Sequence, residues 1–182
     1  DTINGTGRKG ISDDKIGFIK LNAHRMRRIE KTIAVDENVP RQIRSLNVDW
    51  IWLTLTEAWC GDSAQNIPVI EKLAAANEGI QTRYIFRDEN PKLMERFLTN
   101  GARSIPKLIV FDLRTRQVLG AWGPRPVKAQ EYFEKLKADG LDKAAIMEQL
   151  QRWYLADRGR SLQLELQHLV AIWSRPAFLA AA

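Results

Sequence analysis

The chain has 182 residues, of which 45% are hydrophobic, 27% are charged and one is cysteine. This length supports one domain with a sizeable core, and a single cysteine excludes an intramolecular disulfide, so we expect the reducing cytoplasm. The formal charge of +6 is too small and too scattered to indicate a nucleic-acid-binding protein, and no apolar run is long enough to indicate a membrane protein.

The first part of the chain is predicted to hold a disordered lead and one amphipathic helix. Residues 1–11 are rich in glycine and poor in apolar side chains, which favours disorder. Residues 12–34 are predicted to form a helix docked on the core, because apolar residues recur there every three or four positions: Ile16, Ile19, Ala23, Met26 and Ile29. The other face of this helix is basic and carries Arg25, Arg27, Arg28 and Lys31. It is either exposed to solvent, which we favour, or a patch that binds an acidic ligand.

The only cysteine lies where a predicted strand meets a predicted helix. The run from Trp50 to Thr56 is aromatic and β-branched, which is typical of a central strand. After the turn from Trp59 to Ser63, apolar residues at helical spacing predict a helix. Cys60 would therefore lie at a helix N-terminus, where the dipole and unpaired N–H groups lower the pKa of a thiol, although the carboxylate of Asp62 would oppose this.

The remaining pattern predicts an α/β arrangement. Strands are predicted at residues 80–86, 107–112 and 117–122, the last two as a hairpin, and helices at about 90–100 and 127–138. Two more helical patterns lie in 141–173, separated by Gly159. We therefore expect one domain over residues 12–174, with a core at about 48–138, helices at 12–34 and 141–173 packed on it, and a tail at 175–182.

The turn resembles the active-site turn of the thioredoxin superfamily. Trp59-Cys60-Gly61 matches that turn, Pro68 lies where the family has a proline in the following helix, and Ile105-Pro106 stands before a strand where the family has a cis-proline. The stretches Arg87-Asp88-Glu89-Asn90 and Trp122-Gly123-Pro124-Arg125-Pro126 look like a bacterial group called thioredoxin family proteins, whose turn ends in Asp-Ser or Asp-Ala. The resemblance implies a thioredoxin-like α/β fold, a mixed sheet of βαβ and ββα halves, here with extra N-terminal and C-terminal helices.

Two departures from the family pattern define the expected chemistry. Ser63 stands in place of the second cysteine, and Thr54 in place of the buried aspartate that helps to deprotonate it. The dithiol cycle is therefore excluded within one chain. We hypothesise a monothiol redox protein in which Cys60 forms a mixed disulfide or a sulfenic acid that an external thiol resolves.

The resemblance also implies roles for the neighbours of Cys60. Ile105 and Pro106 would orient a peptide or small thiol at the sulfur, while Trp59, Gly61 and Asp62 shape the turn. Ser63 could donate a hydroxyl hydrogen bond to the thiolate. Further candidates are charged: Arg103 and Lys107 could offset Asp62, and Glu57 is a weak candidate for proton transfer.

Two other functions remain open. The chain could be a non-catalytic binding module that keeps the fold as a scaffold, or an iron–sulfur carrier of the monothiol glutaredoxin type, a group whose turn has an aromatic residue where Asp62 stands. We expect no cofactor and no metal ligands, because two histidines and one cysteine are too few for such a site. The expected partner is a protein or low-molecular-weight thiol or disulfide, and the oligomeric state is left open.

Overall fold

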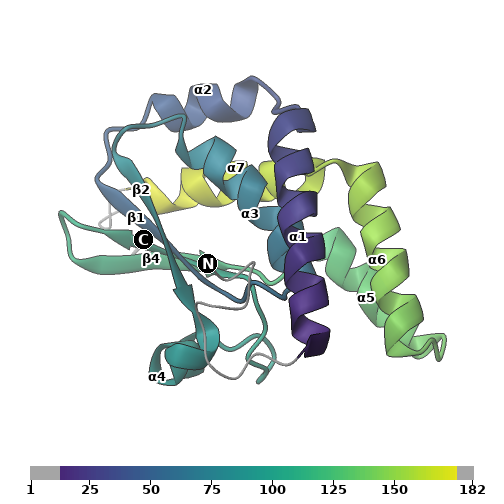
Figure 1. Cartoon of the computed structure of the whole chain (residues 1–182). Helices are drawn as coiled ribbons and strands as arrows, with labels where there is room; N and C mark the ends of the chain where they lie inside the picture. The colour runs from purple at the N-terminus through teal and green to yellow at the C-terminus, as the bar shows by residue number, and fades with distance from the viewer. Residues whose placement is uncertain (1–12, 176–182) are drawn as a thin grey trace.

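The computed structural model describes residues 13–175, whose strands form one mixed sheet in the order β2-β1-β3-β4 (Figure 1). The central strand β1 (Trp50–Thr56) pairs in parallel with β2 (Ile80–Phe86) and antiparallel with β3 (Lys107–Asp112). β3 pairs antiparallel with β4 (Gln117–Trp122), with a bulge after Val110. Helix α3 (Gly61–Ala74) makes the crossover between the parallel strands. The predicted thioredoxin-like α/β fold with extra helices is confirmed.

One face of the sheet carries the main hydrophobic core. Helices α3, α7 (Arg160–Trp173) and α2 (Asn38–Arg44) cover this face, and α1 (Asp13–Thr32) lies along α3 (Figure 1). The core joins strands and helices far apart in sequence; its fully buried members include Trp52, Ile70, Leu73, Leu108, Leu162 and Leu166. Side chains of this size each stabilise the fold by about 1.5–3 kcal/mol when they leave water.

The other face holds a smaller cluster, and this cluster encloses the cysteine. Its buried members are Leu55, Cys60, Met94, Ile105 and Ile109. Met94 comes from α4 (Pro91–Met94), which lies on the opposite side of the sheet from α2 and α7 (Figure 1). Short 3₁₀ turns flank α4: η2 (Arg87–Glu89) before it and η3 (Glu95–Phe97) after it.

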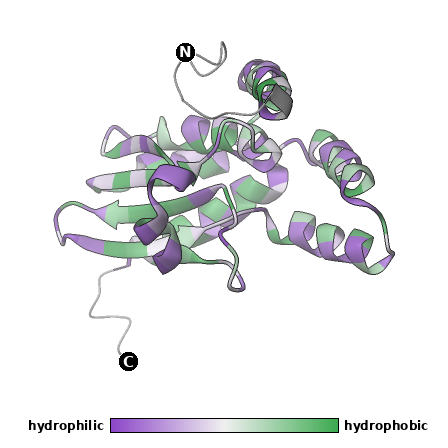
Figure 2. Ribbon diagram, turned by 60° about the horizontal axis from the view of Figure 1, so that its bottom comes forward, coloured by the Kyte–Doolittle hydropathy of each residue, from purple (hydrophilic) through white to green (hydrophobic). Residues whose placement is uncertain are grey.

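Helices α5 (Val127–Ala138) and α6 (Lys143–Asp157) stand beside the sheet and pack on each other. Their ribbons alternate between hydrophilic and hydrophobic residues (Figure 2), as expected of helices with one solvated face. Leu136, Ile146 and Leu150 form the apolar contact between them.

Two helices differ from the prediction. The sequence pattern did not predict α2, whose first turn holds Val39 and Pro40; proline is tolerated there because its missing N–H has no partner within the helix. Val39 and Ile43 are buried in the main core, so packing stabilises this short helix. The helix expected at 90–100 is α-helical only to Met94, and the Asn90 amide donates to the carbonyl of Phe86 rather than capping the helix.

The expected lead at 1–11 and nearly all of the expected tail at 175–182 lie outside the described residues. The C-terminal segment is two helices, α6 and α7, joined through Arg158 and Gly159, which both have positive φ. Within residues 13–175, no helix combines the length and the apolar character that a membrane crossing requires.

Candidate functional site

Cys60 caps the N-terminus of α3, as the strand-to-helix reading of the turn predicts. Its backbone is extended, and its side chain is buried with 8% of the residue exposed. The thiol donates a weak hydrogen bond to the carbonyl of Ile105, with 3.4 Å between sulfur and oxygen. The Ile105–Pro106 peptide bond is cis. The sulfur therefore faces the prolyl loop that precedes β3.

Ser63 lies beside the sulfur, one turn into α3. The Thr56 hydroxyl donates to Ser63 Oγ over 2.8 Å, which leaves the Ser63 hydrogen for the sulfur. Hydrogen bonds from the Ser63 hydroxyl and from the backbone N–H groups of Asp62 and Ser63 favour the Cys60 thiolate and so lower its pKa. Thr56 was not foreseen as part of the site, because a threonine at the end of a strand carries no distinctive sequence signal.

The predicted lowering of the Cys60 pKa is wrong for this structure. Burial is the largest influence, and it raises the pKa of the thiol because the thiolate loses its hydration. The negative charge of Asp62 raises the pKa further, and the hydrogen bonds from α3 and Ser63 offset only part of this. At neutral pH the resting form of Cys60 is the thiol.

Asp62 is the centre of a buried polar network that joins α3 to α5 and α6. Its Oδ2 lies 2.7 Å from Nη2 of Arg125, and its Oδ1 accepts a hydrogen bond of 2.9 Å from the Tyr154 hydroxyl. Burial raises the pKa of the Asp62 carboxyl, while Arg125 and Tyr154 act in the opposite direction. The guanidinium of Arg125 also stacks over the Phe133 ring at 4.3 Å, which fixes it from the other side.

Sequence reasoning gave no role to Arg125 or Tyr154. Arg125 lies in the Trp122–Pro126 stretch that resembles a bacterial thioredoxin group, and it follows a second cis peptide bond, Gly123–Pro124. That resemblance was the available signal. Tyr154 is on α6, and no motif connects it with the turn in the sequence.

The cations expected near the sulfur bind elsewhere. Arg103 is exposed and forms an ion pair with Glu95, and the Lys107 ammonium donates to Thr99 Oγ1 and to the carbonyl of Gly123. Arg125 is instead the cation that contacts Asp62. The expectation that Arg103 and Lys107 offset Asp62 is therefore wrong, because both cations have other partners and Arg125 is the cation whose charge acts on the Asp62 carboxyl.

Glu57 is buried, and its carboxylate accepts a hydrogen bond of 2.9 Å from the backbone N–H of Asp88. This contact ties the turn before Cys60 to η2. Asn22 of α1 adds a second tie, since its amide donates to the carbonyl of Ala58 over 3.0 Å. The turn is thus held by α1 on one side and by η2 on the other.

Trp59 and Gly61 shape the two flanks of the turn. Two cations contact the half-buried indole of Trp59, the Lys15 ammonium at 4.8 Å and the Arg87 guanidinium at 5.3 Å from the ring centroid. A Cβ on Gly61 would lie 3.4 Å from the Gln151 amide nitrogen and 4.0 Å from Nη1 of Arg25. These are ordinary van der Waals distances, so the turn lies next to α6 and α1, and a small side chain at this position would fit without moving either helix.

Thr54 is fully buried, and its hydroxyl has no hydrogen-bond partner among the described residues. A threonine hydroxyl does not ionise at neutral pH, so it cannot act as the base that the family places there. Within residues 13–175, no group of three histidine, cysteine or acidic side chains is arranged to hold a metal ion.

Comparisons with known proteins agree on the fold. A family model described as thioredoxin matches residues 13–137. An HIV epitope-scaffold protein is 14% identical over 88% of this chain and 87% of its own, with a TM-score of 0.59. A protein of unknown function from Pseudomonas aeruginosa is 15% identical over 93% of this chain and 89% of its own, also with a TM-score of 0.59. No curated protein matches significantly. At these identities the two structures show the fold alone. The family model, however, spans most of the chain, and this chain therefore belongs to the thioredoxin family.

Proposed function

We propose that this protein is a thioredoxin-fold monothiol redox protein of the cytoplasm, in which Cys60 forms a mixed disulfide with a protein or a small thiol. The observation that carries the proposal is the position of the sulfur, which lies at the N-terminus of α3 and against the carbonyl that precedes cis-Pro106. Ser63 and two backbone N–H groups are aimed at the same sulfur and stabilise its thiolate. An inert structural cysteine needs none of these donors.

Cys60 can form the mixed disulfide by two routes, one that uses an external disulfide and one that uses an oxidant and a thiol. The Cys60 thiolate attacks one sulfur of a disulfide, a new S–S bond forms, and the other sulfur leaves as a thiolate that takes up a proton. By the second route, a peroxide oxidises Cys60 to a sulfenic acid, and a thiol then condenses with it and releases water. Release of the adduct needs a second external thiolate, because the Ser63 hydroxyl is not ionised at neutral pH.

The raised pKa of Cys60 makes the proposed reaction slow to start and slow to reverse. Few molecules carry the thiolate at pH 7, so capture accelerates as the pH rises toward the pKa of the thiol. A thiolate of high pKa is also a poor leaving group, so an incoming thiol displaces Cys60 from the adduct slowly. These properties suit a protein that holds a partner better than one that turns over many substrates.

A second candidate is the non-catalytic binding module, which the burial of the sulfur and its raised pKa favour. In that case Cys60 is a core residue and stays unmodified in the folded protein. The iron–sulfur carrier is the weakest candidate, since cluster binding would need a thiolate that is open to a second chain, and the buried thiol of Cys60 faces Ile105.

Mass spectrometry after treatment with a small disulfide, 2-hydroxyethyl disulfide, separates the two leading candidates. The monothiol proposal predicts one adduct on the folded wild type at pH 8.5 and none on Cys60→Ala. An adduct that forms only in urea would favour the binding module instead.

Ser63→Cys provides a second test. It should add a resolving thiol and convert capture into turnover of a protein disulfide, though slowly, because Thr54 cannot deprotonate the new cysteine. Unaided turnover by the wild type would contradict the monothiol proposal.

A further inference from the structure

A cleft of about 420 Å³ lies between α1, α3 and α6, next to the turn that carries Cys60 but lined by none of the residues of the apolar cluster around its sulfur. Its walls combine two exposed leucines, Leu21 and Leu155, with polar and basic side chains. The polar lining consists of His24, Arg25, Arg28, Gln65, Glu148, Gln151 and Arg152. Sites for small organic molecules in proteins have volumes of about 300–1,000 Å³, so the cleft is large enough for one.

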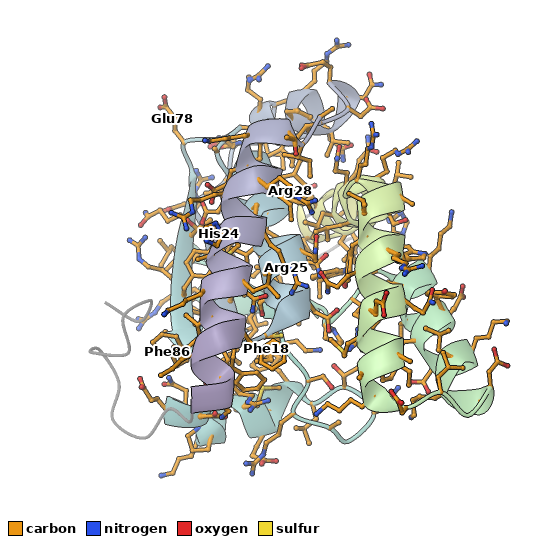
Figure 3. All side chains as sticks on the ribbon, turned by 45° about the vertical axis from the view of Figure 1, so that its right-hand side comes forward. Phe18, His24, Arg25, Arg28, Glu78 and Phe86 are labelled. Carbon is orange, nitrogen blue, oxygen red and sulfur yellow. The ribbon has the colours of Figure 1, made fainter. Side chains whose placement is uncertain are left out.

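The charges in this cleft do not balance. Arg152 forms an ion pair with Glu148 at 2.6 Å, whereas Arg25 and Arg28 have no carboxylate partner among the described residues. Both arginines point from α1 toward α6 (Figure 3). Partial burial is the larger cause that lowers the pKa of Arg25, and the like charge of the neighbouring Arg28 lowers it further.

A neutral donor completes the polar lining. The Gln65 amide donates to Oε1 of Gln151 over 2.6 Å, which fixes the orientation of the Gln151 side chain. The Gln151 nitrogen is then buried without an acceptor among residues 13–175. A buried donor without a partner is costly, and a bound oxyanion would remove that cost.

We propose that this cleft, which we call the α1–α6 cleft, binds a small organic anion through its carboxylate or phosphate group. Arg25 and Arg28 hold the oxyanion, the Gln151 amide donates a further hydrogen bond, and Leu21 and Leu155 contact the apolar part of the ligand. Guanidinium groups suit both kinds of oxyanion because their N–H groups match the spacing of the oxygens. This site goes beyond the proposed redox function and does not depend on the reactivity of Cys60.

The sequence allowed two interpretations of the basic face of α1, a solvent-exposed surface or a patch for an acidic ligand. In the structure, only some of its arginines line the α1–α6 cleft. Arg25 and Arg28 line the α1–α6 cleft, whereas Arg27 is exposed, does not line it, and donates to the carbonyl of Ala23 in its own helix. Arg27 thus has the same charge and the same helix without the cleft, which makes it a matched control.

Isothermal titration of the full chain with succinate and with inorganic phosphate, at constant ionic strength set by chloride, tests the proposal. We expect saturable binding of at least one probe, weakened about tenfold or more by Arg25→Gln and by Arg28→Gln and unchanged by Arg27→Gln. Preference for succinate or for phosphate assigns the ligand as a carboxylate or a phosphate ester. Gln151→Leu, which leaves the net charge unchanged, should also weaken binding.

Two results would overturn the proposal. One is the absence of saturable binding for both probes, and the other is an equal response in the Arg25, Arg28 and Arg27 variants, which would indicate general screening of a basic surface. Circular dichroism checks that each variant folds. Arg28 is exposed, so its substitution keeps the test valid even if the half-buried Arg25 cannot be replaced.

Discussion

Two opposing influences act on the sulfur of Cys60. Hydrogen-bond donors favour its thiolate, whereas its surroundings in the folded protein disfavour it. The donors come from Ser63 and from the start of α3, and the opposing influences are burial and the charge of Asp62. Arg125 is paired with Asp62 rather than with the sulfur, so that carboxylate compensates its positive charge. The pKa of this thiol therefore depends both on the residues packed around it and on the ion pair that Asp62 forms with Arg125.

Asp62→Asn should lower the pKa of Cys60, because it removes the like charge and leaves that of Arg125 uncompensated. A decrease of one pKa unit gives about tenfold more thiolate at pH 7, so alkylation by iodoacetamide should accelerate by about that factor. The variant loses a buried ion pair and should be less stable by about 3 kcal/mol, so rates are compared well below its melting temperature. Asp139→Asn, an exposed site on the C-cap of α5, is the control, and an unchanged rate in Asp62→Asn would refute this account.

The titration of Cys60 should also make the free energy of unfolding depend on pH. In the folded state the pKa of Cys60 is raised above the unfolded value of about 8.5, so the folded state binds the thiol proton more tightly than the unfolded state. The protonated thiol therefore makes its full contribution to the free energy of unfolding below pH 8.5. As the pH rises through and above 8.5, the wild type should lose free energy of unfolding relative to Cys60→Ser, which does not titrate. Urea titrations of both proteins from pH 7 to about 10 measure the difference. A constant difference across this range would show that the thiol is not perturbed.

The sequence was informative at this scale where a residue acts within its own segment. Cys60, Gly61 and Ser63 belong to one turn, and its position before a helix follows from local patterns. The partners of Asp62 come from the loop before α5 and from α6, and their position beside the turn depends on tertiary packing that no local pattern records. For the same reason, Arg103 and Lys107, which are near Pro106 in sequence, proved to be held by other groups.

Among the elements, α7 depends on a glycine in the sheet. A Cβ added at Gly120 in β4 would lie 2.2 Å from Nε1 of Trp173, the last residue of α7, and the indole ring has no flexible end that could yield. Gly120→Ala should therefore displace the end of α7 and lower the free energy of unfolding by about 1–3 kcal/mol.

Gly17→Ala is the matched control for Gly120→Ala. It lies inside α1 with no atom within 4 Å of its added Cβ, so it should stabilise the protein by about 0.5–1 kcal/mol. Urea denaturation measures both variants. Equal effects of the two substitutions would show that β4 and α7 are not in close contact.

Periodicity located the long elements well and the short ones poorly. The strands and helices α1, α5 and α7 have enough turns or alternations for the pattern to be read. α2 is short, and burial of Val39 and Ile43 stabilises it despite Pro40. The expected helix after Asn90 is interrupted by η3, which periodicity does not distinguish from an α-helix.

For the whole molecule, the main core is assembled from both ends of the described chain. Leu162, Leu166 and Val170 of α7 are fully buried against α2, α3 and the sheet. The side chain of Gln163 accepts from the backbone N–H of Asp36 and donates to the carbonyl of Ala34, which locks α7 to the loop after α1. Helix α7, which lies outside the family-matched residues 13–137, is thus part of the main core.

A chain that ends after Arg158 should therefore fail to fold cooperatively. It exposes the apolar face that α7 covers, and the loss of three buried aliphatic side chains alone removes about 5 kcal/mol or more, comparable with the whole stability of many domains. Circular dichroism and tryptophan fluorescence during urea denaturation check this. The full chain should give one coincident transition by both probes, and a truncated chain that does the same would show that residues before α7 form an independent domain.

The bonds of Gln163 to residues near the end of α1 also bear on how the protein is made. During synthesis on the ribosome, β1 to β4 emerge well before α7. The sheet face that carries Trp52 and Leu108 therefore stays partly uncovered until α7 has been synthesised. Contacts that span so much of the chain form slowly, and apolar surface exposed in the meantime invites aggregation. We therefore expect the nascent chain to be prone to aggregation until Trp173 has left the exit tunnel, whatever chemistry Cys60 performs afterwards.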